Sequence, residues 1–359
     1  MKVLHVSGGF AAHPLYLQLT RHLRTHCSYQ LVFSPVRSAA ELARLPANEP
    51  GVLEYDYRRV LQPWHRLLFG AKIRRIFSEL CRATDPGRFD LVHAHTLYSD
   101  GAIALRLKRQ FGIPFAVAVR NTDINFFMRL RPDLASVARE VLHEAGRVVC
   151  LSPAYREALL GKLRGPLREE VRAKAAVIPN GIGALWLEEW SRPPRSADAP
   201  VQLLHVGDLS ANKNVEGILR AAAVLHSRRG VRLTLVGGSG AREAALRKRL
   251  DGSGLTYVQY LGRIDDARAL RDVYRQHDIL VMPSFHETFG IVYIEALSQG
   301  LPVIHSKGQG IDGFFTPGTV SQAVDPNDIQ DIARAAEALT ERHETVSPLC
   351  MAMAKGFSW

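Results

Sequence analysis

The chain has 359 residues, of which 47% are hydrophobic and 23% charged, and this composition is typical of a soluble globular protein. Its length suits two domains better than one, and no apolar run approaches the ~20 residues that a membrane-spanning helix needs. The formal net charge of +11 predicts a surface that attracts anions, while four widely spaced cysteines without a Cys-x-x-Cys pair argue against a zinc ribbon or redox motif.

Short apolar runs alternate with helix-like stretches through the first half of the chain. Helices are expected at 14–26 and 100–112. Strands are expected at 2–7, 29–35, 90–96, 114–120 and 147–152. Near-continuous apolar strands separated by helices indicate a parallel sheet that is covered on both faces.

The alternation restarts after a polar, proline-rich stretch at 188–200. The expected strands are 201–208, 231–240, 256–263, 278–284 and 302–307. The expected helices lie near 214–228, 241–251 and 266–276, and a further one begins at about 290. We therefore predict an α/β fold with two doubly wound, Rossmann-like domains, 1–188 and 201–345, joined by a linker at 189–200 and facing across a cleft.

One stretch of the second half, HETFGIVYIEAL at 286–297, suggests an anion site. Phe289, Gly290 and Ile291 fall at the expected start of a helix, where free amides and the helix dipole attract a phosphate. Glu287 and Glu295 would then accept hydrogen bonds from the hydroxyls of an attached sugar. The alternative is that Glu287 only complements the helix dipole and Glu295 is a solvated helix residue.

Lys213, in VGDLSANKN at 206–214, is a second candidate for binding a phosphate, although surface lysines are common. The segment GQGIDG at 308–313 matches G-x-G-x-x-G, but no helix pattern follows it, so the context for dinucleotide binding is missing. No D-x-D pair occurs in the sequence, and we predict that the site holds no metal.

In the first half, LVHAHTLYSDG at 91–101 ends a strand with His93 and His95. We expect these two side chains to point to opposite faces, one of them buried in the core and the other at the end of the strand. Neither acids nor cysteines flank them at ligand spacing, so the pattern does not support a metal site.

Taken together, these motifs resemble those of the family-4 retaining glycosyltransferases of GT-B architecture. The resemblance rests on the Glu-x7-Glu pattern of 286–297 and extends over nearly the whole chain. Its other elements are SGGF (7–10), DLVHAH (90–95), VIPNGI (177–182), VGDLSANKN (206–214), YLGRI (260–264), GLPVI (300–304) and AVDPNDI (323–329).

The resemblance implies a role for each matching residue. The donor-binding residues would be Gly9, Lys213, Arg263, Ile264, Glu287, Phe289, Gly290, Ile291 and Glu295. Among them, Glu295 would hold the ribose hydroxyls, Arg263 and Ile264 would contact the nucleobase, and Lys213 would bind the diphosphate. Catalytic roles fall to His95, Glu287 and Lys213, and Asn121 would lie on the acceptor side. The segment 346–359 would cross back toward the first, acceptor-side domain.

The sequence departs from the family pattern at Asp208, where relatives usually carry an arginine that supplies a second diphosphate cation. Lys307 or Arg263 are the candidates to replace that cation. The chain also stops at 359, where relatives usually continue with a closing helix.

The function implied is retaining, metal-independent transfer of a hexosyl group from a UDP-, GDP- or ADP-sugar to a sugar or lipid-linked acceptor, without a further cofactor, in bacterial-type polysaccharide or glycolipid synthesis. The alternatives are a nucleotide-sugar epimerase on the same scaffold and a catalytically inactive binding subunit. We expect a cytoplasmic protein that binds no nucleic acid. The arginine-rich segment 58–77 suggests contact with an anionic membrane, or else an ordinary helix packed on the sheet.

Overall fold

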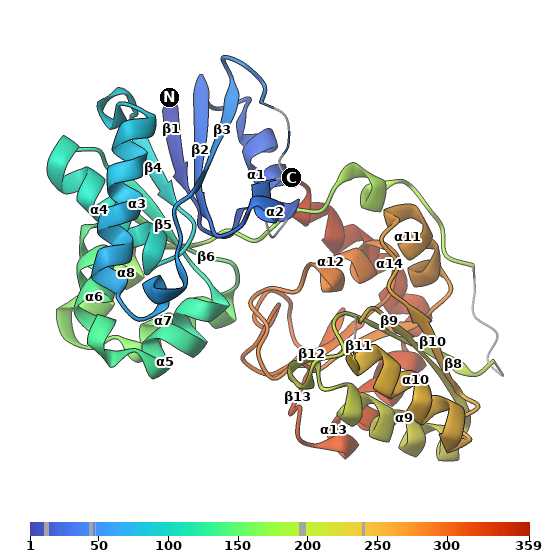
Figure 1. The fold of residues 1–359 in the computed structure, drawn as a ribbon. Coiled ribbons are helices and arrows are strands. Elements are labelled where there is room, and N and C mark those ends of the chain that lie inside the picture. The colour runs from blue at the N-terminus through green and yellow to red at the C-terminus, as the bar shows by residue number, and fades with distance from the viewer. Residues whose placement is uncertain (11–13, 43–45, 47, 194–198, 239–240) are drawn as a thin grey trace. The chain divides into compact units, whose positions relative to one another are not determined.

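The computed structural model describes residues 1–10, 14–42, 46, 48–193, 199–238 and 241–359 (Figure 1). Contacts between residues divide the chain into two compact units, one made of 1–151 with 156–178 and the other of 152–155 with 179–359. Residues 179–188 are thus grouped with the second unit, although the linker was predicted to begin only after them. Part of that predicted linker, 194–198, lies outside the described residues.

The described residues of the first unit form a seven-stranded parallel sheet in the order β3-β2-β1-β4-β5-β6-β7. Its strands are β1 (Lys2–Val6), β2 (Tyr29–Val36), β3 (Leu53–Arg59), β4 (Leu91–Ala94), β5 (Phe115–Val119), β6 (Arg147–Cys150) and β7 (Ala175–Val177). The helices are α1 (Pro14–Leu23), α2 (Ala39–Leu42), α3 (Phe69–Ala83), α4 (Ser99–Phe111), α5 (Met128–Leu130), α6 (Ala135–Glu144), α7 (Pro153–Lys162) and α8 (Gly165–Lys174).

The second unit contains a six-stranded parallel sheet in the order β10-β9-β8-β11-β12-β13. Its strands are β8 (Val201–Val206), β9 (Val231–Val236), β10 (Val258–Gly262), β11 (Ile279–Met282), β12 (Val303–Ser306) and β13 (Ser321–Val324). Its helices are α9 (Val215–Arg229), α10 (Ala241–Ser253), α11 (Ala267–Arg275), α12 (Ile291–Ser298), α13 (Ile329–Glu341) and α14 (His343–Ala354).

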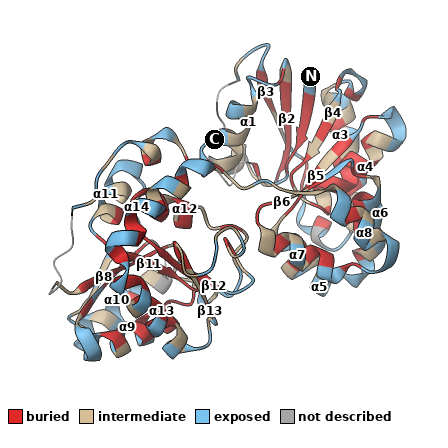
Figure 2. Cartoon of the chain, turned by 180° about the vertical axis from the view of Figure 1, so that it is seen from behind, coloured by how far each residue is buried: buried red, intermediate tan, exposed pale blue. Residues whose placement is uncertain are grey.

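The prediction of two Rossmann-like α/β domains is confirmed, and each predicted strand is present. Both sheets are buried along their central strands, which are red in Figure 2. Three strands were not predicted. They are β3, whose sequence LEYDYRR carries charges, and the short β7 and β13.

The strand orders fix where ligands can be expected. In the first sheet β1 lies between β2 and β4, and in the second β8 lies between β9 and β11, so the order reverses at these two strands. In open parallel sheets the loops at the carboxyl ends of strands beside such a reversal form the binding crevice. The loops after β1, β4, β8 and β11 carry Gly9, His95, Lys213 and Glu287. Of the other candidates, Asn121 follows β5, and Arg263 and Ile264 follow β10.

The segment 58–77 is not one helix. It comprises the end of β3, a 3₁₀ turn at Pro63–Arg66 and the first part of α3, whose apolar side chains Ile73, Ile76 and Leu80 are buried in the first unit. For α3, therefore, the alternative of an ordinary packed helix holds. Among the helices in the described ranges, none has the length and apolar character to cross a membrane.

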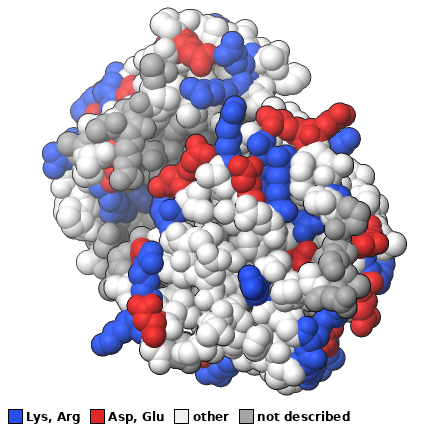
Figure 3. Space-filling model, turned by 90° about the vertical axis from the view of Figure 1, so that its right-hand side faces the viewer, with Lys and Arg blue, Asp and Glu red and all other residues white. Residues whose placement is uncertain are grey.

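Charged side chains of both signs are interspersed on the face that Figure 3 presents. Charged side chains of the second unit form ion pairs, as Arg249 does with Glu216 and Arg228 with Glu337. On this face, therefore, the net charge of +11 does not show as a surface of one sign.

Candidate functional site

The start of α12 is built as the sequence suggested. Gly290 is the N-cap residue and adopts a left-handed backbone with φ of 76°. A Cβ at this position would lie 2.4 Å from Cε2 of the buried Tyr293, so no side chain fits there. Gly290 therefore leaves the first turn of the helix without a side-chain cap, and Ile291 begins the helix behind it. Exposed amides at a helix start favour an anion.

Lys213 lies beside this helix start. It ends a 3₁₀ turn (Ala211–Lys213) after β8, and its Nζ donates a hydrogen bond of 2.5 Å to the Glu287 carboxylate. Both side chains are mostly shielded, with 20% and 13% of their surface exposed. A cation and an acid are thus held together in front of α12.

The neighbouring asparagines hold these loops in place. Asn212 accepts from the His286 amide at 3.0 Å and donates to the His286 carbonyl at 2.9 Å. Asn214, in a left-handed conformation, caps α9 by accepting from the Gly217 amide and donates to the Pro326 carbonyl. The two asparagines therefore position Lys213 against Glu287, a role that the sequence pattern did not reveal.

Glu295 lies in the second turn of α12 and is partly buried. The hydroxyl of Tyr274, a fully buried residue of α11, donates to its carboxylate at 3.2 Å. Burial raises the pKa of Glu295 to about 7, and the Tyr274 hydrogen bond opposes this rise only in part. Glu295 is thus not the solvated helix residue of the alternative interpretation.

A cavity of about 360 Å³ opens at the carboxyl ends of β8, β9 and β10. Arg263 and Ile264, the two residues predicted to contact a nucleobase, both line it together with Asp208. Gly207 and Gly237 also line it, and a Cβ at Gly237 would meet the Gly207 carbonyl oxygen at 2.0 Å.

The two candidate replacements for the missing arginine already have acidic partners. Arg263 donates to Asp265 at 2.6 Å, and Lys307 lies 3.6 Å from Asp331. Asp208 itself is exposed at the rim of the cavity. Of the three cations, Lys213 is the one that is bonded to Glu287 in the loop before α12.

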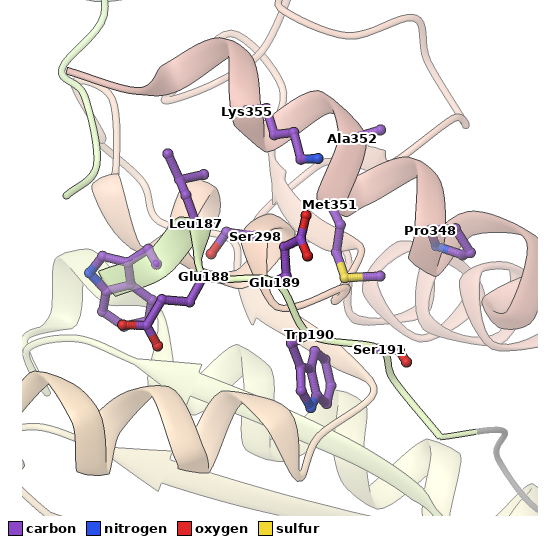
Figure 4. Close-up of a pocket in the computed structure, with 11 residues that line it drawn as sticks. Leu187, Glu188, Glu189, Trp190, Ser191, Ser298, Pro348, Met351, Ala352 and Lys355 are labelled. Carbon is purple, nitrogen blue, oxygen red and sulfur yellow. The ribbon is translucent and has the colours of Figure 1, made fainter. Parts of the chain in front are cut away.

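A second cavity, of about 520 Å³, lies away from these strand ends (Figure 4). It opens between the segment 186–191 and α14, with Trp190, Glu189 and Met351 among its lining. No sequence motif predicted this cavity. Its position does not match the strand-end crevice of a doubly wound fold, so we do not assign it to the predicted site.

In the first unit, His93 and His95 lie on the same side of β4. Their rings stack with centroids 4.1 Å apart, and both approach His5 of β1. The expectation that they point to opposite faces is wrong, because side chains two residues apart in a strand share a face. His95 is fully buried, and among the described residues its Nδ1 has no hydrogen-bond partner.

The glycine loop after β1 is held by a buried acid. Asp100 accepts from the Gly8 amide at 3.1 Å and from the Thr96 hydroxyl at 2.9 Å. Burial raises the pKa of Asp100 to about 6. A Cβ on Gly9 would stand 3.9 Å from the Tyr16 ring, an ordinary contact, so this geometry alone does not demand glycine at that position.

A second buried acid, Asp123, lies beside the predicted acceptor-side residue Asn121. Its carboxylate accepts from the amides of Arg120 and Leu97 at 2.8 and 3.1 Å, and burial raises its pKa to about 7. Asn121 itself accepts from Asn125 at 2.6 Å, and its acceptor-side role stays a prediction.

These features define a class. Each unit is a Rossmann-like domain with candidate residues at the carboxyl ends of strands. The second combines an uncapped helix start, a lysine and a cavity of about 360 Å³. This is the arrangement of two-domain nucleotide-sugar enzymes of GT-B architecture.

Comparisons with known proteins agree. Residues 14–183 match the family model described as Glycosyltransferase Family 4, and residues 200–342 match the model described as Glycosyl transferases group 1. The chain is therefore a glycosyltransferase, and its two halves carry these two domain types.

Two relatives are informative. The D-inositol 3-phosphate glycosyltransferase of Arthrobacter sp. (strain FB24) is 27% identical over 292 residues, which are 76% of this chain and 68% of that protein. The glycogen synthase of Mycobacterium tuberculosis is 26% identical over 325 residues, 88% of this chain and 74% of that one.

Solved structures show the same fold. A sucrose-phosphate synthase from Thermosynechococcus elongatus matches with a TM-score of 0.74 and 21% identity over 100% of this chain and 95% of its own. Anabaena HepE, solved in complex with UDP-glucose, matches with a TM-score of 0.71 and 19% identity over 100% and 96%.

Proposed function

We propose that the protein transfers a hexosyl group from a nucleotide diphosphate sugar to a sugar or lipid-linked acceptor, with retention and without a metal ion. The observation that carries this proposal is the Lys213–Glu287 pair in front of the uncapped start of α12. One relative fold, Anabaena HepE, was solved with UDP-glucose, which favours a nucleotide-sugar donor here as well.

In this proposal the donor diphosphate lies at the amides of residues 289–291. Lys213 turns from Glu287 to the phosphate, and Glu287 is then free to accept from a hydroxyl of the transferred sugar. Glu295 holds the ribose hydroxyls, while Arg263 and Ile264 contact the base through the main chain. The fully buried Phe289 supports the helix start by packing against Phe314 and Phe357.

The reaction breaks the bond between the anomeric carbon and the phosphate oxygen, whose electron pair stays on the leaving diphosphate. A bond forms between that carbon and the acceptor oxygen, and the acceptor proton passes to the leaving phosphate. Lys213 and the helix amides stabilise the charge that grows on the diphosphate. Loss of one such donor costs about 3–4 kcal/mol of transition-state stabilisation. His95 contacts the transferred sugar, and Asn121 lies on the acceptor side.

Product analysis tests the proposal. Thermal-shift measurements with UDP, GDP and ADP first identify the donor class, and we expect one of them to raise the melting temperature well above the others. Incubation of the matching nucleotide sugar with a panel of sugar and lipid-linked acceptors should give a glycoside with the donor's anomeric configuration. EDTA should leave this activity unchanged.

The two alternatives predict other products. An epimerase converts the nucleotide sugar into a new one without any acceptor. An inactive binding subunit binds the nucleotide but gives no transfer and no slow donor hydrolysis. The exposed Asp208 in the base cavity is the feature that keeps this last alternative relevant.

We further propose that the protein is cytoplasmic and contacts an anionic membrane through a short apolar tip between β3 and α3. Trp64, Leu67 and Leu68 expose 49%, 80% and 58% of their surface there, and Arg59 and Arg74 nearby are also exposed. Apolar side chains flanked by arginines suit the interface of an anionic bilayer.

Flotation with vesicles tests this contact. We expect the wild type to float with vesicles that contain an anionic lipid and not with purely zwitterionic ones. Leu67→Glu should abolish flotation, whereas Leu349→Glu, at an exposed position of the second unit, should not. Equal flotation of wild type and Leu67→Glu would contradict the proposal.

A further inference from the structure

A chain of buried hydrogen bonds leads to His95 from the neighbouring strands. Gln30 of β2 donates through Nε2 to the Thr20 carbonyl of α1 at 3.0 Å, and its Oε1 lies 3.0 Å from Nε2 of His5. The other ring nitrogen of His5, Nδ1, lies 3.2 Å from Nε2 of His95. Each of these four residues has 0% of its surface exposed.

The side chain of Gln30 fixes which atoms donate and which accept along this series of hydrogen bonds. A carbonyl oxygen only accepts, so the Gln30 amide group must point its NH₂ at Thr20 and its oxygen at His5. His5 therefore carries its proton on Nε2. Since a neutral imidazole has one N–H, Nδ1 of His5 is an acceptor, and His95 must donate to it from Nε2.

Both imidazoles are neutral at physiological pH. Burial lowers the pKa of His5 to about 4, and burial together with the nearby His93, His5 and Arg120 lowers that of His95 well below its usual range. The proton on His95 is thus held at Nε2, and its Nδ1 retains a free lone pair.

That lone pair is a buried acceptor without a protein partner among the described residues. Leaving such a group unpaired costs about 1–3 kcal/mol, so the site favours a ligand that donates a hydrogen bond to it.

A metal ion is a poorer occupant, although nitrogens of His5, His93 and His95 all lie within 4.8 Å of one another. The rings of His93 and His95 are inclined by only 29° in their stack, so their in-plane lone pairs run side by side and do not converge on one point. The Arg120 guanidinium, bonded to the His95 carbonyl at 3.2 Å, further opposes a cation.

We propose that His5 and Gln30 are positioning residues that hold His95 as its Nε2–H tautomer, so that Nδ1 accepts a hydrogen bond from a hydroxyl of the transferred hexose. This inference rests on the contact between His95 and the sugar in the proposed function. It adds a specificity rule: the sugar position that faces His95 must carry a hydrogen-bond donor. A donor analogue with fluorine there can accept but not donate, and it should react about tenfold or more slowly.

The tautomer can be measured without substrate. Long-range ¹H–¹⁵N correlation spectra of the ¹⁵N-histidine-labelled protein, with His95→Gln for assignment, should show His95 protonated at Nε2 alone. Gln30→Met removes the oxygen that fixes His5, and we expect His95 then to populate both tautomers. A wild-type His95 protonated at Nδ1 would overturn the proposal whatever the activity.

Kinetics test the positioning role with a matched pair at His5. Asparagine can still accept from His95 Nε2, whereas phenylalanine fills the space without an acceptor. Residues that orient metal-bound imidazoles are typically worth about 10–100-fold, and we take the same scale here. We therefore expect His5→Phe and Gln30→Met to lower kcat about tenfold or more, with little change in the affinity for the free nucleotide. His5→Asn should restore most of the loss.

Thermal unfolding and nucleotide binding show whether each variant is folded. If the folded His5→Phe and His5→Asn variants lose the same activity, the positioning role is refuted. The wild type could show the Nε2–H tautomer while His95→Ala retains full transfer activity. That result would refute the contact between His95 and the sugar. If His95→Ala still binds the nucleotide, the proposed donor site of the second unit is not refuted by that result.

Discussion

Replacement of Glu295 by glutamine should make the free protein more stable and its donor binding weaker. In the folded protein burial raises the pKa of Glu295 from 4.5 to about 7, because the partly buried carboxylate loses water that, among the described residues, the Tyr274 hydroxyl alone replaces. The contribution of Glu295 to the free energy of unfolding of the wild type is fully present below pH 4.5. It is lost as the pH rises through about 7, because the buried carboxyl group then ionises. Glutamine does not ionise, so the variant does not lose this contribution as the pH rises.

The difference between a pKa of 4.5 and one of about 7 corresponds to on the order of 3 kcal/mol. Above pH 7, Glu295→Gln should therefore exceed the wild type in free energy of unfolding by about 2–3 kcal/mol, since some water still reaches the side chain. Below pH 4.5 the two proteins should be equally stable.

Urea unfolding at pH 4.5, 6 and 8 measures this difference, and the exposed Glu344→Gln is the matched control, for which no such trend is expected. Titration with the nucleotide that binds best gives the second half of the prediction. Ribose hydroxyls donate to a carboxylate, so wild-type affinity should rise between pH 6 and 8, and the glutamine variant should bind more weakly at pH 8. A constant stability difference across this pH range, or unchanged nucleotide affinity, would refute the assignment.

Three further predictions concern the start of α12 and the base cavity. Lys213→Met should lower kcat/KM for the natural donor by about 100–1000-fold. The control variant Lys248→Met, at an exposed position, should not lower it, and equal activity of the two variants would remove Lys213 from the mechanism. Asp208→Arg should tighten nucleoside diphosphate binding about tenfold by calorimetry, because a charge-assisted hydrogen bond to phosphate replaces a repulsion, and weaker binding would contradict this placement. Gly290→Ala should cost about 2–3 kcal/mol in urea unfolding, since its Cβ would lie 2.4 Å from the Tyr293 ring at a positive φ, and a neutral effect would show that this turn can relax.

The sequence predicted the fold because buried parallel strands are near-continuous apolar runs, as in Ile279–Met282 of β11. It missed β3 because LEYDYRR alternates tyrosines with charges in the manner of an exposed loop or edge strand. The start of α12 at Ile291 was also foreseeable, since a glycine between a strand and an apolar helix marks a helix boundary.

The site was predictable only where one local segment builds it. The pairing of Lys213 with Glu287 joins residues 74 positions apart, and only the sheet order brings the loops after β8 and β11 together. In the same way, His5 meets His95 because β1 and β4 are neighbours with His5 in register with His93. Burial, which raises the pKa of Glu295, likewise depends on α11 and has no sequence signature.

If the cavity at the ends of β8, β9 and β10 holds the base, as proposed, the glycines in its lining limit how this protein can change its donor. Gly207 and Gly237 touch so closely that a methyl group on Gly237 would overlap a carbonyl oxygen at 2.0 Å. Mutation there damages the fold before it alters the choice of base. Side chains at the edge, above all Asp208, Arg263 and Asp265, can vary without disturbing the strands beneath. Evolution toward a different nucleotide would therefore change residues around the opening of the cavity, while Gly207 and Gly237 stay constant.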